Sequence, residues 1–216
     1  MTGLLVVTAV PAEADAVRAG LTDTSVTVAS IGVGPAVAGA ATARLLALAE
    51  AAGRPYRAVV SAGVAGGFTG RAAVGDTVLG TASIAADLGA ESPDGFIAVD
   101  DLGMPPALLG GGSIMPADPG LLAALRAALP SATTGPVLTV STVTGTAAGT
   151  DELRRRHPEA VAEAMEGYGV AVAAAQAGVP FVELRTISNP IGPRDRDAWR
   201  LREALSALTT AAPALR

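Results

Sequence analysis

Two polar residues in the C-terminal part of the chain, Glu166 and Asn189, have the types and the spacing of a small-molecule site. Glu166 lies in residues 164–167 (Ala-Met-Glu-Gly), directly before a small, apolar run that predicts a buried helix ending at Gly178. Asn189 follows residues 181–187, whose β-branched composition predicts a strand. Because ligands bind at the carboxyl ends of strands in parallel α/β sheets, we expect the carboxylate and the carboxamide to meet at one rim.

A third candidate acid, Glu13, follows the first apolar run of the chain. Residues 4–10 form a continuous apolar run of strand length, as expected for a strand that is buried on both faces. Pro11 and the acids after it are typical of a helix N-terminus, so Glu13 would lie at the carboxyl end of that strand. From its position alone, Glu13 is either a site residue or an ordinary acidic first-turn residue.

The composition limits the chemistry. The chain has no Cys, and all 15 of its basic residues are Arg, so thiolate and Schiff-base catalysis are excluded. The single histidine, His157, follows three arginines and is predicted to lie at the surface or at a helix end. Most acid–base chemistry must therefore be carried out by carboxylates.

Composition also indicates the class of protein and its partners. Half of the 216 residues are apolar and only 16% are charged, which predicts one globular domain over residues 1–216. A net charge of -5 argues against a nucleic-acid surface. No apolar run approaches the roughly 20 residues that span a bilayer, and the N-terminus lacks the pattern of a signal peptide. We therefore expect a cytoplasmic protein that binds neither nucleic acid nor membrane.

The remaining runs predict an α/β scaffold that would carry these residues. Further strands are expected at 26–31, 58–62, 77–86 and 137–143, and helices at 35–53, 119–129 and 197–208. Segment 87–119 is rich in Gly, Pro and acids, with one weak strand at 96–99. A loop of this length is usually functional or mobile, and we interpret it as a lid or an oligomer contact.

Two glycine-rich segments bear on whether a cofactor binds. Gly32-Val33-Gly34 lies between a strand and a helix, but Val37 occupies the third glycine position of a dinucleotide fingerprint. No acid follows at the ribose position. Gly63–Gly67, predicted as a loop, either lets a flat ligand lie against the backbone or is a plain turn. We expect no cofactor and no metal.

Taken in order, these segments resemble the purine nucleoside phosphorylase and nucleosidase superfamily. The most specific pair is Met165-Glu166-Gly167 with Arg185-Thr186-Ile187-Ser188-Asn189 about 20 residues later, and Gly75-Asp76 also matches. The resemblance covers nearly the whole chain. It implies a three-layer α/β fold with a mixed, twisted sheet partly closed into a barrel, in a homodimer or larger homo-oligomer.

The resemblance also implies roles around a bound purine nucleoside: Glu13, Arg185 and Asn189 in catalysis, and Met165, Glu166, Ser188, Ala65, Gly66 and Ala147 in substrate binding. Glu13 is similar to the general base for water, and Arg185 to the arginine beneath that water. Glu166 is similar to the carboxylate that binds the sugar hydroxyls. Ser188 and Asn189 match the residues that orient the base.

Two positions depart from the methylthioadenosine/S-adenosylhomocysteine nucleosidases of this superfamily. Those adenine enzymes resemble one another in having Asp where this chain has Asn189. An amide cannot release a proton, but its NH₂ donates to a 6-oxo group or to N7. Asn189 therefore favours hypoxanthine, the base of futalosine, which related hydrolases of the alternative menaquinone pathway cleave. Val64 stands where those enzymes have a Ser near the water.

Several functions stay open at this point. Hydrolysis is favoured over phosphorolysis because neither 30–35 nor 61–67 contains an Arg to hold phosphate. A methylthioadenosine/S-adenosylhomocysteine nucleosidase is an alternative, and so is a non-catalytic nucleoside sensor, which would keep Glu166 without needing Glu13. A nicotinamide oxidoreductase is disfavoured by the incomplete glycine pattern.

Overall fold

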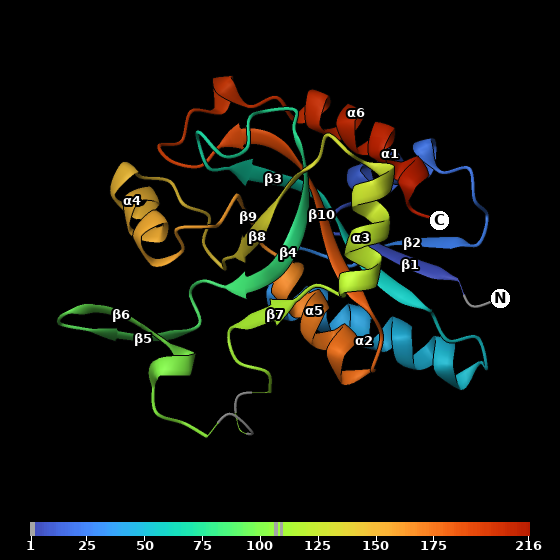
Figure 1. The fold of residues 1–216 in the computed structure, drawn as a ribbon, viewed down its shortest axis with the longest axis horizontal. Coiled ribbons are helices and arrows are strands. Elements are labelled where there is room, and N and C mark those ends of the chain that lie inside the picture. Colours follow the sequence, from blue (N-terminus) through green and yellow to red (C-terminus); the bar gives the residue numbers. More distant parts are fainter. Residues whose placement is uncertain (1–2, 106–107, 109) are drawn as a thin grey trace.

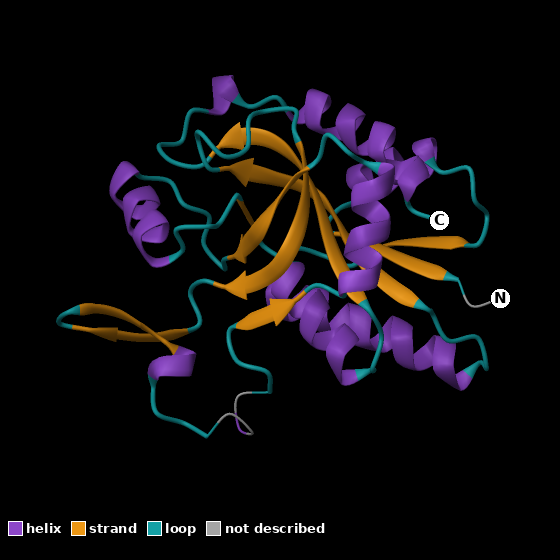
Figure 2. Cartoon of the chain, viewed as in Figure 1, coloured by secondary structure: helices purple, strands orange, loops and turns teal. Residues whose placement is uncertain are grey.

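The computed structural model describes residues 3–105, 108 and 110–216 and has an α/β fold (Figures 1 and 2). The strands are β1 (Leu4–Thr8), β2 (Val26–Ser30), β3 (Ala58–Gly67), β4 (Thr77–Ala85), β5 (Gly89–Ser92), β6 (Gly95–Ala98), β7 (Ile114–Pro116), β8 (Thr133–Thr139), β9 (Ala162–Ala164) and β10 (Phe181–Pro190). The α-helices are α1 (Pro11–Gly20), α2 (Pro35–Ala51), α3 (Pro119–Ala128), α4 (Ala147–Arg156), α5 (Gly167–Gln176) and α6 (Leu201–Ala211). Within the described ranges, none of the helices is both long and apolar enough to cross a membrane.

The central sheet is covered by helices on both faces. Leu4 and Val6 of β1 pack with α1, α3 and α6, whereas Leu5 and Val7 pack with α2 and α5 on the opposite face. Figure 1 shows α2 beside α5 on one side of the sheet and α1 beside α6 on the other. Since successive residues of a strand point to opposite faces, a strand covered on both sides must be apolar throughout.

The main sheet is mixed and partly closed. Its strands run in the order β10-β4-β8-β9-β3-β1-β2, and β10 also pairs with β3, so that five strands close into a ring. β1 pairs in parallel with both β2 and β3, and β10 pairs in parallel with β3. The pairing of β4 with β10 and that of β9 with β3 are antiparallel. This arrangement confirms the fold class expected from the sequence.

Helices α2 and α5 approach each other so closely that only glycine fits between them. A Cβ atom on Gly169 would overlap the carbonyl oxygen of Pro35, and one on Gly39 would lie 3.1 Å from the carbonyl oxygen of Gly169. The contact brings the two helix N-termini together. The N–H of Gly34, the N-cap of α2, therefore donates to Oε1 of Glu166, the N-cap of α5, at 3.4 Å.

The prediction of a loop at Gly63–Gly67 is wrong, because these residues form the second half of β3. This half pairs with β10 along its length and with β9 at Gly66 and Gly67. Glycine has a low strand propensity, but here β10 pairs with this half of β3, and at Gly66 and Gly67 the backbone is also paired with β9 on the other side. The glycines therefore form a flat, ordered strand surface that carries few side chains.

Other boundaries also differ from the predictions. β8 begins at Thr133, so Pro136 lies inside the strand, where the pairing with β4 is irregular. α4, which the expected elements did not include, begins at Ala147, where the side chain of Thr146 caps it by accepting the N–H of Gly149 at 3.0 Å. The short β9 was not predicted, and the last α-helix begins at Leu201, after a 3₁₀ turn at Arg196–Ala198.

Segment 87–119 is more regular than predicted. It contains the hairpin β5–β6 and the strand β7, which pairs with β4. The hairpin projects away from the central sheet in Figure 1. Residues 106, 107 and 109 lie outside the described residues. Whether the segment is a lid or an oligomer contact stays a prediction.

Candidate active site

Glu13 is held by backbone N–H groups from the segment after β1 and from within β3. Its side chain is buried on α1, at 3% exposed. Oε2 accepts hydrogen bonds from the N–H of Ala9 at 2.9 Å and of Val10 at 3.2 Å, and Oε1 accepts one from Val64 at 2.9 Å. A carboxylate offers about four acceptor positions, so one is left for a water molecule or a hydroxyl group. An ordinary first-turn acid would point to solvent instead.

Arg185 joins the carboxylates of this cluster and is fully buried. Its Nη1 lies 3.4 Å from Oε2 of Glu166, its Nη2 donates to Oγ of Ser61 at 3.2 Å, and its Nε donates to Oε1 of Glu183 at 2.8 Å. Burial alone would lower the pKa of Arg185, but the charges of Glu183, Glu166 and Glu13 outweigh it and raise that pKa. The guanidinium group therefore stays charged.

Gly63 makes room for both the acid and the arginine. It is the partner of Arg185 in the pairing of β3 with β10. A Cβ atom on Gly63 would lie 2.6 Å from Oε1 of Glu13 and 2.9 Å from Nη1 of Arg185. The glycine is therefore needed for the approach of two charged side chains, in addition to any contact with a ligand.

Glu183 is a buried acid that the sequence analysis did not identify. It accepts hydrogen bonds from Oγ of Ser83 and from Arg185, and a Cβ atom on Gly167 would overlap its carboxyl group. Burial raises the pKa of Glu183, while the charge of Arg185 acts against that shift. Its position two residues before Arg185 in a buried strand was a usable signal, because residues i and i+2 share one face.

Glu166 lies at the start of α5, as the sequence predicted, and is buried. Its Oε1 accepts from Gly34 and its Oε2 faces Arg185, so both oxygens are oriented by the scaffold. Met165 is half-buried beside it. The structure thus brings Glu13, Arg185 and Glu166 into one cluster, and the ribose-binding role of Met165 and Glu166 stays a prediction.

Asn189 is oriented by the residues on either side of it. Oγ of Ser188 donates to Oδ1 of Asn189 at 2.7 Å, and Nδ2 of Asn189 donates to the carbonyl oxygen of Pro190 at 3.0 Å. The carbonyl oxygen of Ala65 also lies 3.3 Å from Oγ of Ser188. A Cβ atom on Gly66 would lie 2.9 Å from Cγ1 of Ile191 and 3.5 Å from Nδ2 of Asn189, so both side chains lie close to that glycine.

A cavity of about 100 Å³ lies over Gly66, and its lining includes Thr144, Glu163, Asn189, Ile191 and Trp199. Glu163, which the sequence analysis also missed, is 5% exposed and accepts hydrogen bonds from both the N–H and the hydroxyl group of Thr144. Burial raises the pKa of Glu163, and the two bonds from Thr144 counter that shift. A carboxyl group and a carboxamide thus share one cavity.

Ala147 and His157 lie apart from this cavity. Ala147 is exposed at the start of α4 and lines a neighbouring hollow with Thr150 and Arg154. Its expected contact with the base stays a prediction. His157 is the C-cap of α4, at a helix end as predicted, and burial followed by the charge of Arg156 lowers its pKa.

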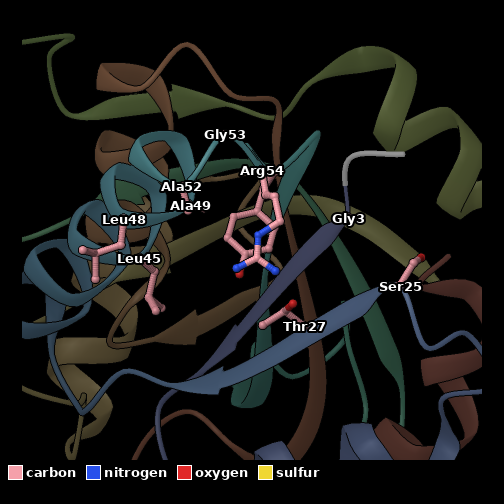
Figure 3. A pocket seen from close by; sticks show the side chains of 10 residues that line it. Gly3, Ser25, Thr27, Leu45, Leu48, Ala49, Ala52, Gly53 and Arg54 are labelled. Atoms are coloured by element: carbon pink, nitrogen blue, oxygen red, sulfur yellow. The ribbon is translucent and has the colours of Figure 1, made fainter.

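A second, larger hollow lies away from the acid cluster. It has a volume of about 840 Å³ and is lined by residues such as Ser25, Leu48, Arg54 and Tyr56 (Figure 3). Arg54 is the one charged residue of its lining, so this hollow has no acid–base pair. Within the described ranges, no group of three or more His, Asp or Glu residues is placed to hold a metal ion. The cluster around Glu13 is therefore the better candidate site.

The fold and the acid cluster define a class of protein. The family model of the phosphorylase superfamily matches residues 6–216. The chain belongs to the phosphorylase superfamily. A solved structure of a methylthioadenosine/S-adenosylhomocysteine nucleosidase from Colwellia psychrerythraea, in complex with adenine, superposes with a TM-score of 0.79 at 22% identity. That comparison covers 99% of this chain and 96% of the other, and it shows the shared fold.

Within the superfamily, the chain is similar in sequence to two curated futalosine hydrolases. It is 55% identical over 180 residues to the one from Streptomyces coelicolor, covering 83% of this chain and 74% of that protein. It is 47% identical over 229 aligned positions to the one from Acidothermus cellulolyticus, covering 98% of this chain and 89% of that protein. The resemblance inferred from the sequence motifs is confirmed.

Proposed function

We propose that this protein is a nucleosidase that hydrolyses the N-glycosidic bond of futalosine and releases hypoxanthine and dehypoxanthine futalosine. The observation that carries the proposal is the arrangement of Glu13, Arg185 and Glu166 in one buried cluster. The cavity around Asn189 lies at the end of β10, the strand that also carries Arg185. The similarity to two futalosine hydrolases supports this substrate. The proposed reaction places the protein in menaquinone biosynthesis.

The cluster suits the charges of this reaction. Breaking the bond develops positive charge on the sugar and negative charge on the departing purine. Glu166 would accept hydrogen bonds from the ribose hydroxyls, and Glu13, with one acceptor position left, would take a proton from the attacking water. The NH₂ group of Asn189 would stabilise the charge on the purine at N7 or O6. Arg185 orients the acids and balances part of their charge.

The charge of the cluster favours water over phosphate as the nucleophile. Three carboxylates, Glu13, Glu166 and Glu183, surround the one guanidinium group of Arg185. Its Nε, Nη1 and Nη2 all have partners within the protein. A phosphate dianion would meet uncompensated negative charge there, whereas a water molecule would not.

The direct test is an assay of hypoxanthine release from futalosine. We expect release without phosphate, and no sugar phosphate when phosphate is added. Release that depends on phosphate would identify a phosphorylase instead. Tight binding of futalosine with no release would identify a nucleoside sensor, and faster release of adenine from methylthioadenosine would favour the alternative nucleosidase.

Asn189 is expected to set the choice of base. Asn189→Asp would place a carboxylate against O6 of hypoxanthine, so that two acceptors meet without a proton between them. The kcat/KM for the 6-oxo substrate should fall by the equivalent of about 1–3 kcal/mol. The kcat/KM for adenine nucleosides should rise relative to it. The measurement is kcat/KM for matched hypoxanthine and adenine nucleosides. An unchanged preference would mean that the base is recognised elsewhere.

Glu166 is expected to recognise the ribose hydroxyls. The wild-type protein should therefore cleave a ribonucleoside faster than its 2′-deoxy analogue, since the lost hydrogen bond to a charged acceptor is worth about 1.5–3 kcal/mol. In Glu166→Ala the advantage of the ribonucleoside should largely disappear. Equal rates on both sugars in the wild-type protein would contradict the assignment.

We also propose that the protein is cytoplasmic and forms a homodimer or larger homo-oligomer. Several large apolar side chains on the segment after β6 are exposed, Leu102, Met104 and Leu108 among them. Exposed apolar residues gathered in one region are typical of protein–protein interfaces. Light scattering on the purified protein measures the oligomeric state, and a monomer at all concentrations would contradict the proposal.

A further inference from the structure

Glu163 is a buried carboxyl group that the mechanism described above does not use. It lines the same cavity as Asn189 although it comes from a different strand, β9. Burying a carboxyl group is unfavourable unless hydrogen bonds compensate for the lost water. Thr144 supplies two such bonds from within the chain. The cavity therefore holds an acid whose position is fixed and whose role is not explained by ribose binding or water activation.

The pairing of the strands places Glu163 and Asn189 on opposite sides of Gly66. In the register of the sheet, Gly66 is the partner of Glu163 on β9 and of Asn189 on β10. Residues paired across strands point to the same face of a sheet. The two side chains thus flank Gly66 and line one cavity, in which Ile191 supplies an apolar wall beside that glycine. A flat purine could lie in this cavity with a polar group at each edge.

The hydrogen bonds of Glu163 leave it able to accept more. Oε1 takes the N–H of Thr144, and Oε2 takes its hydroxyl group. Since each carboxylate oxygen has two acceptor positions, one position on each is left for a ligand. The two ends of the cavity therefore differ in character. Glu163 presents acceptors, and Asn189 presents its NH₂ group.

We propose that Glu163 is a base-recognition residue that accepts the N1–H of a 6-oxopurine while Asn189 donates to its O6 or N7. This inference rests on the proposed function and deepens it. Hypoxanthine carries a proton on N1, so it satisfies the carboxylate. Adenine has a bare lone pair at N1, so its binding would set two acceptors against each other in a buried site. Glu163 and Asn189 together thus select the 6-oxopurine.

The test measures inhibition constants of hypoxanthine and of adenine against hypoxanthine release from futalosine. In the wild-type protein we expect tighter binding of hypoxanthine. In Glu163→Gln the amide NH₂ can donate to N1 of adenine, so the preference for hypoxanthine should fall about 5- to 100-fold. If Glu163 had a purely structural role, the variant would bind both bases more weakly by the same factor. An unchanged ratio of the two inhibition constants would therefore overturn the proposal.

Matched variants keep the test decisive. Glu159→Gln removes the same charge from an exposed position and should leave the ratio unchanged. Glu163→Asp keeps the negative charge but moves the carboxylate away from the base, because its side chain is shorter. It should therefore weaken the binding of hypoxanthine without strengthening the binding of adenine. If Glu163→Gln does not fold, an unaltered ratio in Glu163→Asp overturns the proposal. If wild-type protein releases no hypoxanthine from futalosine, the proposed function fails, whereas release with an unchanged ratio in the variants refutes only the role of Glu163.

Discussion

Glu13→Gln should lower kcat for futalosine by about 10²–10⁴-fold while KM changes little. The substitution keeps the size of the side chain, and the amide oxygen can still accept the N–H groups of Ala9 and Val10. It removes the negative charge and replaces one acceptor oxygen with an NH₂ group. The variant would then have no group to take the proton of the attacking water, although the ribose and base contacts would remain.

Steady-state kinetics of hypoxanthine release measures this effect. The matched control is Asp15→Asn, which removes a carboxylate from the exposed face of the same helix, where Asp15 pairs with Arg18. We expect wild-type kinetics from the control. A Glu13→Gln protein with wild-type kcat would show that another group activates the water, and an increase in KM alone would point to a binding role.

The order of strands and helices was predictable because the core is built from continuous apolar runs. β1 is apolar from Leu4 to Val7 since it is covered on both faces, and the buried α5 begins and ends where Glu166 and Gly178 indicated. The second half of β3 was not predictable from local sequence. Its glycines are held in a strand by pairing with β9 and β10, which lie about 100 residues further along the chain.

The same limit applies to the site residues. Glu13 and Glu166 lie at the ends of predicted elements, where a functional role is expected, so both were candidates from the sequence. Glu183 could have been found from its place on the same face of a buried strand as Arg185, whereas Glu163 lies in the short strand β9, whose pairing is long-range. Glu163 reaches the base cavity only because β9 pairs with β3 opposite Gly66, and no local pattern reveals that contact.

Arg185→Met should destabilise the protein by about 3–5 kcal/mol at neutral pH, the usual effect of removing one member of a buried ion pair. Glu183 would keep its hydrogen bond from Ser83 but lose both the Nε–H donor and the opposite charge. Glu166 and Glu13 would lose the same positive neighbour. By comparison, Arg155→Met breaks an exposed pair with Glu152 and should change stability by only about 0–1 kcal/mol.

The loss of stability in Arg185→Met should depend on pH with a definite sign. Burial already raises the pKa of Glu183, and without Arg185 that pKa should rise further. A group whose pKa is higher in the folded state favours folding when it is protonated, and this contribution is lost as the pH rises through the folded-state pKa. The stability of the variant should therefore be closest to that of the wild type at acid pH, and the difference in stability should grow as the pH increases.

Urea unfolding of the wild type and of Arg185→Met from about pH 5 to about pH 8 measures this dependence. Adding Glu183→Gln to the variant provides the decisive comparison, because it removes the buried charge that Arg185 had balanced. We expect the double variant to unfold at higher urea concentrations than Arg185→Met at the alkaline end and to show a flatter pH dependence. If Arg185→Met loses the same stability at every pH, its defect comes from lost packing, and the uncompensated charge of Glu183 is not its cause.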